Sequence, residues 1–143
     1  MNPDARRRLE DLLDREIELA RSLAAALASE RTALTGHSPQ AVEQIAAEKI
    51  QVIAAMEKLE EERRALCASP GSVKMAASVL ERWRSLLQVM SGCRSANDVN
   101  GHIIHVRQNQ VRQLLDIVRG GPSITYDPQG KTFAKALRAL ARA

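Results

Sequence analysis

The chain has 143 residues, of which 45% are hydrophobic but only 2% aromatic, so a core must be built from aliphatic side chains and Ala. With 27% charged residues of both signs and no run of 18 apolar residues, the composition predicts one all-helical domain and excludes an integral membrane protein. The net charge of +4 is uneven, because residues 120–143 carry +3 and the other 119 residues carry only +1.

Residues 4–34 are predicted to form the first helix, because apolar side chains recur there at steps of three, four or seven. Asp4 follows Pro3 and is the expected N-cap, and Thr35-Gly36 is the expected C-terminal stop. The apolar stripe of this helix consists of Leu9, Leu13, Ile17, Ala20, Leu23, Leu27 and Leu34.

Ser38-Pro39 opens the second predicted helix, with Ser as the cap and Pro in the first turn. Its apolar seam follows a heptad pattern. The seam consists of Val42, Ile45, Lys49, Val52, Met56, Leu59, Arg63 and Leu66. Lys49 and Arg63 are expected to bury their stems and keep their charges in water. Ile50 and Ile53 widen the stripe toward a second neighbour, and the short connection makes the first two helices antiparallel.

A third helix is expected from Ser69-Pro70-Gly71 to about Ser91, and a fourth from there to Arg119, with Ser91-Gly92 as the break between them. Gly120-Gly121-Pro122 ends the fourth helix. The apolar positions are Val73, Ala76, Leu80, Trp83, Leu87 and Met90 in the third helix, and Ile103, Ile104, Val111, Leu114, Leu115 and Val118 in the fourth. We therefore expect an all-α, elongated antiparallel bundle or coiled coil of about four helices over residues 1–119.

Residues 120–143 are expected to be a flexible C-terminal tail with a short amphipathic helix. Phe133, Leu137 and Leu140 face one side of that helix, and its Lys and Arg residues face largely the other. Tyr is enriched at interfaces, and an amphipathic helix can lie in a partner's groove. Tyr126, Phe133, Leu137 and Leu140 are therefore candidate partner-binding residues, with docking of the tail on its own bundle as the alternative.

The sequence offers little support for catalysis or for a cofactor. It contains no phosphate-binding loop, nucleophile elbow or paired-carboxylate site. His102 and His105 have a spacing that can hold a metal, but no third or fourth ligand is apparent. Cys67 and Cys93 do not form a disulfide framework, so both thiols are expected to be reduced in a cytoplasmic protein. We expect neither an enzyme nor a cofactor or metal site.

Binding to another macromolecule is the remaining class of function. Arg6-Arg7-Arg8 and the basic tail raise the possibility of nucleic acid, but acidic residues interleave with the basic ones and an aromatic stacking platform is missing. A long Ala-rich helix pair exposes grooves that accept another amphipathic helix, unless the remaining helices fill them. A structural coiled-coil adaptor is therefore one hypothesis, and a basic helical nucleic-acid binder is a weaker one.

An ordered set of residues in the second half of the chain resembles the pattern of the FlgN family of flagellar export chaperones. The set consists of Asn97, Asn100, Gly101, Ile104, Leu114, Ile117 and Gly120. Cys93 precedes it, and Tyr126-Asp127-Pro128-Gln129-Gly130 follows it with a small departure from the commoner Tyr-Gly-Pro-Asp-Gly form. Because Gly costs about 1 kcal/mol against Ala inside a helix, Gly101 is expected to allow a close backbone contact.

The resemblance implies a small cytoplasmic helical chaperone that binds the hook-associated proteins FlgK and FlgL. It also implies delivery of this cargo to the export gate protein FlhA, without nucleotide hydrolysis. FlgK and FlgL pair through terminal helices in the assembled hook–filament junction, so before export these helices expose apolar stripes that need cover. In the family the C-terminal region takes part in both contacts, which here corresponds to Tyr126 and to residues 133–140.

Overall fold

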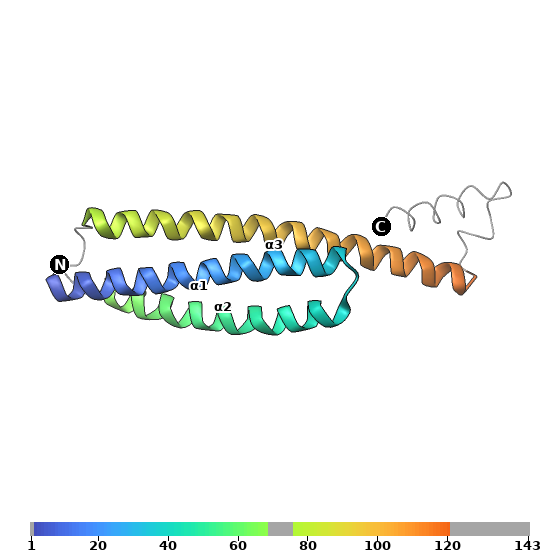
Figure 1. The fold of residues 1–143 in the computed structure, drawn as a ribbon, viewed down its shortest axis with the longest axis horizontal. Coiled ribbons are helices and arrows are strands. Elements are labelled where there is room, and N and C mark those ends of the chain that lie inside the picture. The colour runs from blue at the N-terminus through green and yellow to red at the C-terminus, as the bar shows by residue number, and fades with distance from the viewer. Residues whose placement is uncertain (1, 69–75, 121–143) are drawn as a thin grey trace. The chain divides into compact units, whose positions relative to one another are not determined.

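The computed structural model describes residues 2–68 and 76–120 and places them in three helices (Figure 1). The helices are α1 (Pro3–Thr35), α2 (Pro39–Cys67) and α3 (Ala77–Val118). Every regular element among the described residues is helical, as predicted. The chain divides into two compact units, residues 1–100 and 101–143, and α3 contributes to both.

The N-terminal cap of α1 differs from the prediction. Asn2, not Asp4, caps the helix, because the Oδ1 of Asn2 accepts a hydrogen bond of 3.1 Å from the backbone N–H of Asp4. Pro3 occupies the first helical position, where a missing N–H costs nothing. Asp4 therefore lies inside the first turn, where its negative carboxylate interacts favourably with the positive end of the helix dipole.

The connection between α1 and α2 is confirmed in position but not in backbone detail. Gly36 ends α1 by donating its backbone N–H to the carbonyl of Thr32, yet its φ is −83°. The left-handed conformation falls on His37, with φ 55°. Ser38 and Pro39 then begin α2 as predicted, although the Ser38 side chain makes no capping hydrogen bond.

The apolar stripe predicted for α1 lies in the core. All seven of its residues are buried, and along α2 Ile45 and Leu59 are buried as well. One core cluster joins Leu9, Leu13, Ile17 and Ala20 to Val79 and Leu86 of α3. The second core cluster joins Leu23 and Leu27 to Cys93. Ile50 and Ile53 do not extend this core, because they are 69% and 39% exposed.

Two ion pairs fix the register of α1 against α2. Glu16 binds Arg63 with an N···O distance of 3.0 Å, and Glu30 binds Lys49 at 2.9 Å. The two carboxylates lie two heptads apart on α1, and the two cations lie two heptads apart on α2 in the opposite order, so the helices are antiparallel. The prediction that Lys49 and Arg63 keep their charges in water is wrong, because buried carboxylates of α1 take the place of water.

The Glu16–Arg63 ion pair also contacts α3. The guanidinium of Arg63 stacks over the ring of Trp83 at 4.7 Å from its centroid, so one cation joins all three helices. Burial raises the pKa of the Glu16 carboxyl above its ordinary value of 4.5, and the hydrogen bond from Arg63 opposes that rise without cancelling it. The ionised pair therefore holds this position with a residual desolvation cost.

The raised pKa of Glu16 predicts a pH dependence of stability. The folded protein holds the Glu16 proton more tightly than the unfolded chain, so the stabilising contribution is present below pH 4.5 and is lost as pH rises through the folded pKa. We expect the free energy of unfolding of the wild type, minus that of Glu16→Gln, to increase as pH falls from 7 to 4.5. Urea unfolding of both proteins at several pH values measures this difference, and an opposite slope would mean that Arg63 outweighs desolvation.

α3 is one helix of 42 residues, so the predicted break at Ser91-Gly92 and the count of about four helices are wrong for the described residues. Gly92 is exposed, and its helical penalty of about 1 kcal/mol is outweighed by the burial of Cys93 one residue later. The buried face is also shifted by one position, since Leu86 is buried and Leu87 is 50% exposed. The predicted start at residues 69–71 lies outside the described residues.

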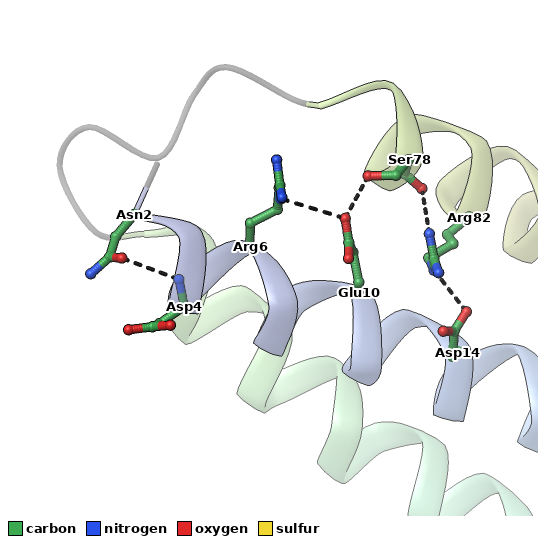
Figure 2. A network of polar contacts seen from close by, with 7 residues as sticks. All are labelled: Asn2, Asp4, Arg6, Glu10, Asp14, Ser78 and Arg82. Atoms are coloured by element: carbon green, nitrogen blue, oxygen red, sulfur yellow. Dashed lines mark hydrogen bonds and ion pairs between the residues drawn. The ribbon is translucent and has the colours of Figure 1, made fainter.

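Polar contacts attach the beginning of α3 to the beginning of α1 (Figure 2). The hydroxyl of Ser78 donates to Glu10, which also lies 3.7 Å from Arg6. One turn further along, Arg82 donates to Asp14 at 2.9 Å and to the backbone carbonyl of Ser78. Successive residues of both helices pair in the same chain direction, so α1 and α3 run parallel.

Candidate helix-binding surface on α3

The buried face of α3 is a strict heptad. Val79, Leu86, Cys93 and Asn100 are seven residues apart, and they are the buried residues of this helix. Cys93 packs against Leu23 and Leu27, with its Sγ 3.5 Å from the carbonyl oxygen of Ala20, and burial raises the pKa of this thiol. Cys93 is therefore a small core residue and not a reactive thiol.

Asn100 ends this heptad with a polar cluster. Its side chain is 1% exposed, and its Nδ2 donates to the carbonyl of Leu27 and to Glu30, both at 2.9 Å. Glu30 in turn accepts from Lys49, so one residue from each helix meets at this level. The Oδ1 of Asn100 has no hydrogen-bond partner among the described residues. A single buried Asn at such a position specifies the register of a coiled coil at some cost in stability.

Beyond Asn100 most apolar side chains of α3 are exposed. Ile104, Val111 and Val118 are seven residues apart, Leu114 and Leu115 lie between them, and their exposed fractions run from 37% to 75%. We call these five residues the α3 stripe. The apolar pattern of these positions predicts a bundle helix with a buried face, but the five side chains are exposed.

The α3 stripe lies in the basic part of the chain. Residues 101–143 contain seven Lys or Arg and two Asp or Glu, a net charge of +5, whereas residues 1–100 carry −1. Arg107 lies within the stripe, seven residues after Asn100, and Arg112 lies at its edge. The surface is thus an apolar heptad seam bordered by positive charge, which is suited to an amphipathic helix and not to a small polar substrate.

One other sequence prediction for this region is wrong. Gly101 does not mark a close backbone contact, because a Cβ added there meets nothing within 4 Å. His102 and His105 are both exposed, and the described residues contain no group of three His, Cys, Asp or Glu placed to hold a metal. Gly120 does end the helix as predicted, with φ 69° and its N–H bonded to the carbonyl of Ile117.

Two further grooves lie on the bundle, and charged side chains make up most of the lining of the first and half of the lining of the second. The groove between α1 and α3 includes Asp11, Asp14, Arg15, Glu18, Arg21, Glu81 and Arg82. The groove between α1 and α2 alternates charged and apolar side chains, and includes Arg15, Glu18, Lys58 and Glu62 with Leu19, Ala55 and Leu59. Both lack the continuous apolar seam that a helix requires, so the α3 stripe is the stronger candidate surface.

The predicted partner-binding residues Tyr126, Phe133, Leu137 and Leu140 lie outside the described residues. Of the residues that carry the family resemblance, Asn100 is buried, whereas Asn97 and Gly101 are exposed. Ile104 and Leu114 belong to the α3 stripe. Sequence reasoning did not identify Val111, Leu115 or Arg107 as functional, and the basic composition after residue 100 was the available signal.

A family model described as "FlgN protein" matches residues 1–133 of the chain. The chain belongs to the FlgN family. This family is one of flagellar export chaperones, so the chain has a general role in flagellum biogenesis and protein export. No curated protein and no solved structure matches the chain significantly. In the described part of this FlgN chain, no helix is both long and apolar enough to cross a membrane.

Proposed function

We propose that this FlgN chain binds the hook-associated proteins FlgK and FlgL in the cytoplasm, keeps them monomeric and delivers them to the export gate protein FlhA. The observation that carries the proposal is the α3 stripe, an exposed heptad seam in a member of an export chaperone family. A cargo helix that later pairs in the hook–filament junction needs temporary cover of the same geometry. The α3 stripe offers that cover without any catalytic group.

The stripe by itself supports only moderate binding. Full burial of a Val, Leu or Ile side chain contributes about 1.5–3 kcal/mol, and part of that is already realised because these side chains are 37–75% exposed. Roughly 5 kcal/mol then remains for five side chains, which is comparable with the cost of association. We propose that Tyr126, Phe133, Leu137 and Leu140 add the further contacts, and that moderate affinity permits release at the gate.

Direct binding of purified FlgK and FlgL from the same bacterium tests the function. We expect one-to-one complexes of micromolar or higher affinity by calorimetry, and retention of FlgK or FlgL when the tagged chain is recovered from a lysate. Recovery of an unrelated helical protein without FlgK or FlgL would support a coiled-coil adaptor instead. Recovery of nucleic acid, with an affinity that falls steeply with salt, would support a basic helical nucleic-acid binder.

Replacing Phe133, Leu137 and Leu140 together by Ser is expected to weaken cargo binding by about tenfold or more, since each loses an apolar contact. The bundle should remain folded, because the core clusters among the described residues join α1, α2 and α3 through residues 9–96. Calorimetry with FlgK or FlgL measures the first effect, and circular dichroism with thermal melting measures the second. Unchanged cargo affinity would rule out a role of the C-terminal residues in binding cargo.

A further inference from the structure

Arg107 occupies an unusual place on the α3 stripe. It continues the heptad of Val79, Leu86, Cys93 and Asn100, and the next heptad position is Leu114. Its side chain is half-buried, yet it forms no hydrogen bond or ion pair with any described residue. A cation on an apolar seam is costly to cover unless the covering helix supplies a partner.

Within the bundle, cations on a helix seam are paired with buried carboxylates. Lys49 and Arg63 lie on the seam of α2, and each is bound by a buried carboxylate of the facing helix at 2.9–3.0 Å. In both cases the carboxylate comes from a seam position of α1 that is otherwise occupied by Leu, Ile or Ala. By the same ion pairing, we expect the helix that covers Arg107 to carry an Asp or Glu at a seam position.

We propose that the α3 stripe takes one amphipathic helix of the cargo that carries an Asp or Glu within its own apolar seam, and that Arg107 selects this helix. The inference rests on the proposed function, to which it adds the chemistry of the recognised segment. Arg107 fixes the register of the bound helix, because a shift by one heptad places the carboxylate against apolar side chains. Arg112 adds attraction at the edge of the same surface.

Other occupants are less complementary. Residues 131–143, where the amphipathic helix of the tail is predicted, contain four Lys or Arg and no Asp or Glu, so this stretch of the same chain supplies no acidic side chain for Arg107. A second copy of residues 101–118 presents two Arg and a single acid, Asp116. The stripe is narrow, heptad-spaced and without aromatic residues, which favours a helix over a membrane surface.

Charge substitution at Arg107 tests the inference. We expect Arg107→Glu to lower the affinity for FlgK or FlgL by about tenfold or more at low ionic strength, and Arg107→Gln by a smaller factor. Arg94→Glu is the matched control, because Arg94 is an exposed arginine of the same helix outside the stripe. It should change affinity by less than about threefold. Thermal melting establishes that all three variants fold.

The outcomes separate the inference from the proposed function. If the wild type binds neither FlgK nor FlgL, the proposed function fails and the inference fails with it. If the wild type binds but Arg107→Glu and Arg94→Glu have equal effects, only the selection by Arg107 is wrong. A third outcome is that the wild type sediments with phosphatidylglycerol vesicles, that Arg107→Glu does not, and that both bind cargo equally. This result would assign the surface to a membrane and overturn the inference.

Discussion

Replacing Val111 and Leu115 together by Ser should lower the affinity for FlgK and FlgL by about a hundredfold while the bundle stays folded. Both side chains lie on the α3 stripe and are 56% and 43% exposed, so their removal leaves no cavity in the free protein. In the complex each loses about 1 kcal/mol of apolar burial, and the desolvation of the two Ser hydroxyls adds to this loss. Titration calorimetry against purified cargo measures the affinity.

The matched control is the double variant Val99→Ser with Val106→Ser. These two valines belong to the same helix and are 38% and 39% exposed. Val106 lies five residues before Val111, which places it about 140° around the helix and away from the stripe. The control should therefore keep cargo affinity within about threefold of the wild type. Equal losses in both double variants would show that cargo does not recognise the stripe.

The first two helices were predictable because their patterns are local and consistent. A stripe at helical spacing, a Ser-Pro start and a Gly end together specified both ends of α1 and the start of α2 to within about one residue. α3 was not predictable as a single helix. Ser91-Gly92 is a local signal for a break, whereas the heptad through Leu86 and Cys93 is a longer-range signal for one continuous helix. Tertiary burial prevails over a propensity cost of about 1 kcal/mol.

The candidate surface was harder to predict than the fold. A seam such as Ile104, Val111 and Val118 has the same pattern whether it packs inside the bundle or faces solvent, because periodicity records an apolar face and not its neighbour. The same limit applies to charged seam residues. Lys49 and Arg63 find carboxylates inside the bundle. Only the paired register of α1 and α2 shows this, and no single-helix pattern contains it.

Replacing Glu30 by Ala should be among the most destabilising changes to the bundle, at about 3 kcal/mol of the free energy of unfolding. The Glu30 side chain is 7% exposed and accepts hydrogen bonds from Lys49 and Asn100, so its removal leaves a partly buried ammonium without a counter-charge. A loss of this size is a large fraction of the stability of a small domain. Urea unfolding followed by circular dichroism measures it.

Two comparisons decide whether the polar cluster acts through charge or through register. Glu18→Ala removes an exposed carboxylate of the same helix and should cost less than about 0.5 kcal/mol, so an equal cost for Glu30→Ala would show that water screens the buried pair.

The combined variant Glu30→Leu, Lys49→Met and Asn100→Leu replaces the polar cluster by apolar side chains. This triple variant should equal or exceed the wild type in stability, because no buried polar group is left without its partner. If the cluster sets the register, the same variant should populate additional oligomers in size-exclusion chromatography with light scattering, since an apolar layer permits other pairings. A stable, uniquely monomeric triple variant would leave charge pairing as the whole role of Asn100 and Glu30.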